Sequence, residues 1–194
     1  ARRTTKPGGR DPARRRSTLR MSAPNIVIRE SHRESEADMA ALWRILQPIF
    51  AAGETYCMPR DVSQLDALDY WSGRPHRTFV ATTGEGEIVG TYFLTPNQRG
   101  GGAHVCNCGF ASTIRGVGTA LLQHALTEAR SASFRAMQFN FVVSSNVSAV
   151  RLWERHGFDV VGRLPGAFQH PREGFVDALV MYRQLHDEGQ PASA

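Results

Sequence analysis

The stretch IRGVGTALL, residues Ile114–Leu122, decides the fold, because it lies where a strand gives way to a helix. Two glycines, Gly116 and Gly118, stand at the start of that helix beside Arg115. The first turn of a helix leaves about four backbone N–H groups without intrahelical partners, and the peptide dipoles add partial positive charge there. A phosphate satisfies both needs where no side chain blocks its approach. The stretch therefore indicates either anion binding or a simple turn in which glycine supplies a positive φ.

The spacing separates this stretch from two common phosphate-binding motifs. It runs R-x-x-G-x-A from Arg115 to Ala120, with glycine at position 118. A dinucleotide-binding fold carries G-x-G-x-x-G at such a turn, and a P-loop carries G-x-x-x-x-G-K-[ST]. The pattern therefore disfavours NAD and ATP as ligands.

Apolar periodicity before this stretch predicts two helices and four strands. Ser35 and Asp38 form a start that resembles a capping box, and Gly53 is the expected end of the first helix. The expected strands cover residues 25–31, 77–82, 87–96 and 104–112, and a second helix after Ser63 turns Leu65, Leu68 and Trp71 inward. The TGEGE sequence between the second and third strands indicates a hairpin.

After the stretch, the same periodicity predicts two more helices and three more strands. The helices cover residues 118–131 and 146–158, and the strands cover 135–144, 159–168 and 176–185. The order is strand, helices, three strands, helix, strand, helix and two strands. That order predicts an α/β or α+β fold, a mixed sheet covered by helices, in one domain.

The composition is that of a soluble globular protein. Of 194 residues, 41% are hydrophobic and 21% are charged, and no apolar run approaches the roughly 18 residues that span a bilayer. The N-terminus lacks the apolar core of a secretory signal. The three cysteines, Cys57, Cys106 and Cys108, form no spaced framework, which favours free thiols in a reducing cytoplasm. We therefore expect a cytoplasmic protein without membrane contact.

The net charge of +5 belongs to the N-terminal tail. Residues 1–20 hold eight of the 23 Lys and Arg residues and one of the 18 acidic residues, so the tail carries +7 and the remainder −2. The tail has few apolar residues and cannot bury enough surface to fold. We expect a disordered basic tail at 1–22, a folded domain at 23–186, a disordered tail at 187–194, and no specific nucleic-acid partner.

Two segments together carry a resemblance to a known family. One is the R-x-x-G-x-A motif at 115–120, and the other is NVSAVRLWERHGF at 146–158, which matches N-x-x-A-x-x-L-[YW]-x-x-x-G-F. In this order they resemble the GCN5-related N-acetyltransferase (GNAT) superfamily, whose members bind acetyl-CoA. The resemblance covers about residues 24–185. It implies a central twisted sheet of six to seven strands, mixed but mostly antiparallel, flanked by helices.

The resemblance also implies which residues hold acetyl-CoA. Backbone amides of the first motif wrap the pyrophosphate, and the second motif supplies the next helix. The implied coenzyme-binding residues are Arg115, Gly116, Val117, Gly118, Thr119, Ala120, Asn146 and Trp153. Many members use a tyrosine in the second helix as the acid that protonates the leaving thiolate. Here that position is Trp153, so the proton comes from water or another group, or the thiolate leaves unassisted.

A closer resemblance rests on four further segments. They are GETYCMP at 53–59, GTYFLTPN at 90–97, HVCNCGF at 104–110 and FNFVVSSN at 139–146. With GRLPGAF and GFVDALVMY, they are similar to the fungal N-acetyltransferases that detoxify L-azetidine-2-carboxylate, a proline analogue, and to their bacterial relatives. This similarity implies that Asn107, Phe110 and Asn140 line the acceptor pocket. We expect Asn107 and Asn140 to orient the carboxylate of the acceptor or to hold the tetrahedral oxyanion.

Each acceptor-site residue has an alternative role. Asn107 and Asn140 are alternatively buried amides that satisfy loop backbones, and Phe110 is alternatively a core residue. Glu54 and Tyr56 lie in the loop after the first helix and are expected to reach the acceptor amine. Glu54 is the candidate general base, acting through water, or it simply follows the end of the helix.

No metal site is expected from the sequence. His104, Cys106 and Cys108 would share one face of a regular strand, and imidazole and thiolate are zinc ligands. Three ligands on one strand without a fourth partner at finger-like spacing do not make a structural zinc site.

These observations predict an acetyl-CoA-dependent N-acetyltransferase that acts on a small amine, an amino acid or a toxic analogue. Three alternatives stay open. The same fold acetylates a protein N-terminus or lysine, or it is a catalytically silent acetyl-CoA sensor. From a different class, residues 1–20 bind nucleic acid. The oligomeric state is also open, a homodimer included.

Overall fold

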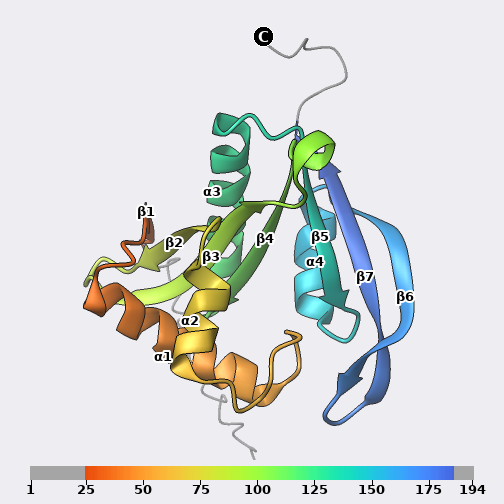
Figure 1. The fold of residues 1–194 in the computed structure, drawn as a ribbon, viewed down its shortest axis with the longest axis horizontal. Helices are drawn as coiled ribbons and strands as arrows, with labels where there is room; N and C mark the ends of the chain where they lie inside the picture. The colour runs from red at the N-terminus through yellow and green to blue at the C-terminus, as the bar shows by residue number, and fades with distance from the viewer. Residues whose placement is uncertain (1–24, 186–194) are drawn as a thin grey trace, which may run out of the picture.

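The computed structural model describes residues 25–185, so both predicted tails, at 1–22 and 187–194, lie outside the described residues. One seven-stranded sheet runs through the described part of the chain, with helices on both faces (Figure 1). The elements follow the order expected from the sequence, with one short 3-10 helix added at Gly100–Gly102. Within residues 25–185, no helix combines the length and apolarity needed to cross a bilayer.

The sheet is mixed and mostly antiparallel, as expected. In spatial order its strands are β1 (Val27–Glu30), β2 (Arg77–Thr82), β3 (Ile88–Pro96), β4 (Val105–Ser112), β5 (Ala136–Val143), β7 (Gly174–Gln184) and β6 (Asp159–His170). Neighbouring strands pair antiparallel except β4 and β5, which are parallel. Parallel neighbours need a crossover, and helix α3 (Val117–Ser131) supplies it.

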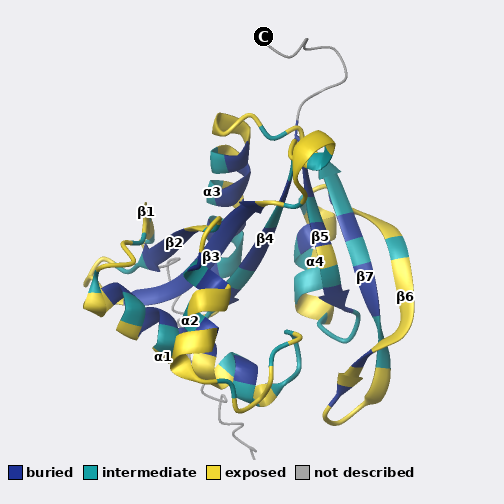
Figure 2. Cartoon of the chain, viewed as in Figure 1, coloured by how far each residue is buried: buried dark blue, intermediate teal, exposed yellow. Residues whose placement is uncertain are grey.

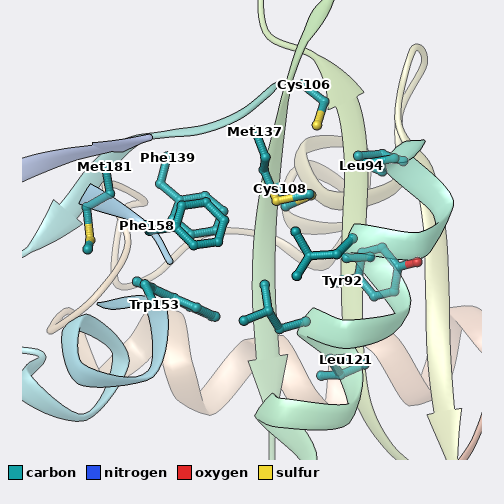
Figure 3. Packing of buried hydrophobic residues seen from close by; sticks show 14 of the residues in the cluster. Tyr92, Leu94, Cys106, Cys108, Leu121, Met137, Phe139, Trp153, Phe158 and Met181 are labelled. Atoms are coloured by element: carbon teal, nitrogen blue, oxygen red, sulfur yellow. The ribbon is translucent and has the colours of Figure 1, made fainter. Parts of the chain in front are cut away.

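Two buried clusters fill the two faces of the sheet. Helices α1 (Glu36–Ala52) and α2 (Gln64–Ser72) cover one face, with Trp71 fully buried between them and the strands. Helices α3 and α4 (Val147–Arg155) cover the other face, where Leu121 packs against the strand residues drawn in Figure 3. Figure 2 shows that the buried positions follow the sheet and the inner sides of the helices. The central strands are therefore buried on both faces.

Local sequence sets the ends of the first two helices. The hydroxyl of Ser35 accepts the N–H of Asp38 at 3.2 Å, and the hydroxyl of Ser63 accepts the N–H of Asp66 at 3.1 Å. Gly53 ends α1 with a left-handed φ of 67°, which glycine adopts without steric cost. The predicted starts at Ser35 and Ser63 and the end at Gly53 are therefore confirmed.

One inward-facing prediction is wrong. Leu65 is 76% exposed, whereas Trp71 is fully buried. The core-facing side of α2 is set by Ala67 and Trp71, which lie four residues apart. Leu65 precedes Ala67 by two residues, about 200° of helical rotation, and so faces away from the sheet.

Strands β4 and β5 are paired over two residue pairs only, Val105 with Ala136 and Cys106 with Met137. Beyond these pairs the strands diverge toward their C-terminal ends (Figure 1). Strand β5 also carries a bulge, because its register with β7 shifts between Phe139 and Val142. A bulge bends a strand and re-aims its side chains. The sheet is therefore open in its middle, at the end where α3 and α4 begin.

The ion pair between Arg29 and Asp38 generates a prediction about stability and pH. The Asp38 carboxylate accepts two bonds from Arg29 and the N–H of His32, which ties β1 to α1. These bonds hold the pKa of Asp38 below its ordinary value, and the hydrogen bond from Arg29 is the largest cause. A lowered folded-state pKa gives stability that is present above the unfolded pKa, about 3.9, and lost as pH falls through the folded pKa.

We therefore expect Asp38→Asn to lower the free energy of unfolding by about 2 kcal/mol at pH 7 and by much less at pH 3. Urea unfolding at both pH values measures this. The control is Asp69→Asn, which breaks an exposed ion pair with Arg33 and should cost less than about 1 kcal/mol. Equal losses for Asp38→Asn at both pH values would contradict the account.

Candidate functional site

A cavity of about 660 Å³ opens where β4 and β5 separate. Strand β4 contributes residues 107–112 to its wall, and β5 contributes residues 139–143. Helices α3 and α4 line it through Gly118 and Leu152, among others, and the loop after α1 reaches it through Tyr56. The cavity therefore connects the start of α3 to the residues expected around an acceptor.

The N-terminus of α3 has no side-chain cap, unlike those of the other three α-helices in residues 25–185. Ser35, Ser63 and Asn146 each accept a backbone N–H at the starts of α1, α2 and α4. The N-cap of α3 is Gly116, which has no side chain to offer. The first-turn amides of α3 and their partial positive charge are thus available to an anion.

The two glycines of this turn do different things. Gly116 has a φ of 91°, so it supplies the left-handed conformation that other residues adopt at a cost, and a Cβ there would meet nothing within 4 Å. Gly118 lines the cavity, and a Cβ there would lie 3.3 Å from Cδ2 of Leu152. Gly116 therefore shapes the turn, whereas Gly118 keeps α3 close to α4 and leaves the wall bare.

The other residues of the motif lie around this turn without lining the cavity. Arg115 is exposed and makes no ion pair within the described chain. The side chain of Val117 is completely buried in the core, so only its backbone faces the turn. Thr119 and Ala120 are half-buried in the first turn of α3.

The two α4 residues expected beside the coenzyme both line the cavity. The side-chain oxygen of Asn146 accepts the N–H of Ala149 at 3.3 Å and the hydroxyl of Ser148 at 3.1 Å, so Asn146 is the cap of α4. Trp153 is 7% exposed and packs against Phe139 with ring centroids 5.0 Å apart (Figure 3). Trp153 thus forms an apolar part of the wall.

Both asparagines expected in the acceptor pocket line the cavity. Asn107 is half-buried, and its side-chain amide makes no hydrogen bond within residues 25–185. Asn140 lies at the bulge of β5, donates to Oδ1 of Asn97 at 2.6 Å and accepts from Nε2 of Gln138 at 2.7 Å. The roles of Asn97 and Gln138 were not predicted, because the fold alone brings Asn97, 43 residues earlier in the chain, to Asn140.

Tyr56 and Phe110 meet at the cavity wall. The hydroxyl of Tyr56 donates to the carbonyl of Phe110 at 2.8 Å and accepts the N–H of Phe110 at 3.0 Å. The ring of Tyr56 packs edge-on against Phe50 and Trp71. Burial raises the pKa of Tyr56, so the phenol stays protonated. Phe110 also stacks on Tyr92 at 5.6 Å, so it belongs to the core and to the wall at once.

Glu54 is not in the wall of this cavity. Its carboxylate pairs at 2.7 Å with Arg172, in the turn between β6 and β7, a partner that was not predicted from the sequence. A second cavity of about 540 Å³ lies between the loop after α1 and this hairpin. Its lining residues are Gly53, Tyr56, Cys57, Met58, Arg60 and the hairpin residues 167–171. Of residues 25–185, Tyr56 alone lines both cavities.

The wall of the larger cavity is uncharged. No Asp, Glu, His, Lys or Arg of the described chain lines it, and its polar side chains carry amides, hydroxyls, the thiol of Cys108 and the indole N–H of Trp153. Burial raises the pKa of the Cys108 thiol, which keeps it from acting as a thiolate nucleophile. Among residues 25–185, no cluster of three or more His, Cys, Asp or Glu side chains is arranged to hold a metal ion.

Comparison with known proteins assigns this chain to a family. Residues 39–158, more than half of the chain, match the model of the acetyltransferase (GNAT) family. The chain belongs to the acetyltransferase (GNAT) family. The matched range includes the uncapped start of α3 and most of the cavity wall. Family membership confirms the fold and the class of enzyme expected from the sequence.

Individual relatives agree with this assignment. A GCN5-related N-acetyltransferase from Kribbella flavida is 38% identical with a TM-score of 0.76, over 82% of this chain and 97% of that one. The N-acetyltransferase aca1 of Schizosaccharomyces pombe is 33% identical over 98 residues, which is 48% of this chain and 47% of aca1. The chain thus matches about half the length of that relative. YncA of Salmonella typhimurium, a putative acetyltransferase solved with acetyl-CoA, has the same fold, with 21% identity and a TM-score of 0.71 over 88% of this chain and 99% of YncA.

The bare wall at Gly118 generates a prediction about coenzyme binding. Gly118→Val places a branched side chain against the cavity and against Leu152. We expect affinity for CoASH to fall by at least about 10-fold, a loss of about 1.4 kcal/mol, in isothermal titration calorimetry.

The double variant Gly118→Val, Leu152→Ala separates obstruction of the cavity from loss of packing. It relieves the contact with Leu152, so the melting temperature should recover while the affinity stays low. Full recovery of affinity in the double variant would show that Gly118 serves helix packing alone.

Proposed function

We propose that this protein transfers the acetyl group of acetyl-CoA to the amine of a small molecule. The observation that carries the proposal is the uncapped N-terminus of α3, which lies at the cavity opened by the separation of β4 and β5. A pyrophosphate placed there satisfies the first-turn amides without a competing side chain. YncA, which shares the fold, was solved with acetyl-CoA, and this supports the choice of ligand.

The coenzyme site uses main chain more than side chains. The amides of residues 117–120 bind the pyrophosphate, and Gly118 lets it approach α3 closely. The exposed guanidinium of Arg115 has no acidic partner in the described chain and adds a cation beside the phosphates. Asn146 and Trp153 line the cavity toward the arm that carries the thioester.

The acceptor site uses neutral amides. The side-chain amide of Asn107 has all its donors and lone pairs available to a ligand within the described chain. The side-chain amide of Asn140 keeps one N–H and one lone pair for a ligand after its bonds to Asn97 and Gln138. Such amides bind the carboxylate of an amino acid without adding a charge that would shift the pKa of its amine. An amino acid or a proline analogue such as azetidine-2-carboxylate suits this arrangement. The similarity to the N-acetyltransferase aca1 supports an acceptor nitrogen.

Acetyl transfer requires the acceptor amine to be neutral. The uncharged wall places no carboxylate or imidazole next to the nitrogen, so its proton leaves through water. Glu54 is the candidate that receives this proton, at a distance, from its position beside Arg172. The indole of Trp153 cannot act as the acid that protonates the released thiolate. The thiolate therefore takes its proton from another group or from solvent.

The decisive experiment measures release of free thiol from acetyl-CoA with a panel of acceptors. The panel contains azetidine-2-carboxylate, proline, other amino acids, polyamines and short peptides. Turnover with amino acids or proline analogues, and little with peptides, supports the proposal. Turnover with peptides alone would assign the protein to peptide acetylation, and no turnover with any amine would leave a coenzyme-binding sensor.

The acceptor role of Asn140 generates a prediction. Asn140→Ala removes the amide at the bulge but leaves the α3 turn unchanged. We expect kcat/KM for the acceptor to fall by about 10- to 100-fold, as for loss of one to two hydrogen bonds to a charged group. The Kd for CoASH should stay within about 2-fold. Full activity of Asn140→Ala on every acceptor would remove Asn140 from the site.

Substitutions of Glu54 and of its ion-pair partner Arg172 give a matched pair of variants. If Glu54 accepts the proton, Glu54→Gln lowers kcat by about 100-fold near neutral pH, the usual size of a general-base contribution. Arg172→Ala breaks the same ion pair but keeps the carboxylate, so its kcat should fall far less. Equal losses in steady-state assays of both variants would mean that Glu54 serves only to hold the β6–β7 hairpin.

A further inference from the structure

The hydroxyl of Tyr56 forms hydrogen bonds with main-chain groups of β4 that are not paired with β5, because the two strands have separated there. It accepts the N–H of Phe110 at 3.0 Å and donates to the carbonyl of the same residue at 2.8 Å. Phe110 lies on β4 beyond Cys106, the last residue of that strand paired with β5. A side chain from the loop after α1 thus bonds to β4 where β5 no longer pairs with it, while β3 still pairs with β4 on its other side.

The position of this hydroxyl relates it to both substrates. Tyr56 lines the larger cavity, which Gly118 of the α3 turn and the acceptor-site residues Asn107 and Asn140 also line. In an acetyl transfer, the carbonyl carbon must lie where the space of the coenzyme meets the space of the acceptor. The aromatic contacts with Phe50 and Trp71 fix the ring, and the two bonds to Phe110 hold the hydroxyl at β4, between Asn107 and the α3 turn along the chain.

We propose that the Tyr56 hydroxyl is a catalytic residue that donates a hydrogen bond to the thioester carbonyl oxygen as that oxygen becomes an oxyanion. The inference rests on the proposed function, because it assumes an acetyl thioester in the cavity. Rotation about the phenol C–O bond re-aims the proton from the carbonyl of Phe110 to the substrate oxygen. The N–H of Phe110 still donates to the hydroxyl oxygen, and such a chain polarises the hydroxyl into a stronger donor.

The step balances without proton transfer from Tyr56. The neutral amine forms the C–N bond, and the carbonyl electron pair moves to oxygen, where the hydroxyl stabilises it. Collapse re-forms the carbonyl and breaks the C–S bond, so the thiolate leaves. The proton lost by nitrogen is matched by the proton that the thiolate takes from solvent. Because burial raises the pKa of Tyr56, the hydroxyl remains a donor and does not become a phenolate.

Tyr56→Phe tests this role because it removes the hydroxyl and keeps the packed ring. We expect kcat to fall by about 100-fold, the size expected for loss of one oxyanion donor, with KM for both substrates and Kd for CoASH within about 3-fold. The matched control is Tyr92→Phe, which removes the hydroxyl of a buried tyrosine bonded to His124 at 2.7 Å, outside the cavity wall. Its kcat should stay within about 2-fold of the parent value.

A spectroscopic measurement gives a readout that packing alone would not move. In the parent protein, the infrared C=O stretch of bound acetyl-CoA labelled with carbon-13 should lie lower in frequency than in Tyr56→Phe, because a hydrogen bond weakens the carbonyl.

The inference is overturned if Tyr56→Phe keeps or raises kcat, if the loss appears in KM or Kd alone, or if the C=O stretch is the same in both proteins. Absence of turnover in the parent protein with every amine would instead overturn the proposed function, and the C=O stretch would then report on Tyr56 separately.

Discussion

Strands β4 and β5 are parallel neighbours that pair at two positions and then part, and the site follows from that separation. The diverging strands leave a cavity of about 660 Å³ in the middle of an otherwise continuous sheet. Parallel strands end at the same edge, so the helices that follow them, α3 and α4, both start beside the opening. One opening therefore brings an uncapped helix N-terminus, a bare glycine wall and two asparagines to the same space.

The chemistry of the wall suits a reaction between two uncharged groups. A carboxylate in the wall would raise the pKa of the amine and favour its protonated form, whereas neutral groups leave that pKa unchanged. The described wall instead offers the amides of Asn107 and Asn140 and the hydroxyl of Tyr56, which donate hydrogen bonds without changing charge. Trp153 fits this pattern, since it contributes surface and no proton. Within residues 25–185, the charged groups named above lie outside this wall, with Arg115 at the α3 turn and the Glu54–Arg172 pair at the β6–β7 hairpin.

The elements could be predicted because their signals are local. The caps at Ser35 and Ser63, the end at Gly53 and the R-x-x-G-x-A turn each depend on a few adjacent residues. Long-range contacts could not be predicted from one sequence. The bonds of Tyr56 to Phe110 span 54 residues, and they depend on where two strands stop pairing. The separate roles of the two glycines in that turn likewise depend on the neighbouring helix α4, and the bulge at Asn140 has no signature in the apolar pattern of its strand.

The central claim is that main-chain amides at the start of α3 hold the diphosphate of coenzyme A. An NMR titration of the nitrogen-15-labelled protein with CoASH observes those amides directly. The account predicts saturable shifts at residues 116–120, and the same amides should respond to ADP, which carries the diphosphate without the thiol arm. Saturable binding that leaves residues 116–120 unshifted, or no binding of CoASH at all, would contradict it.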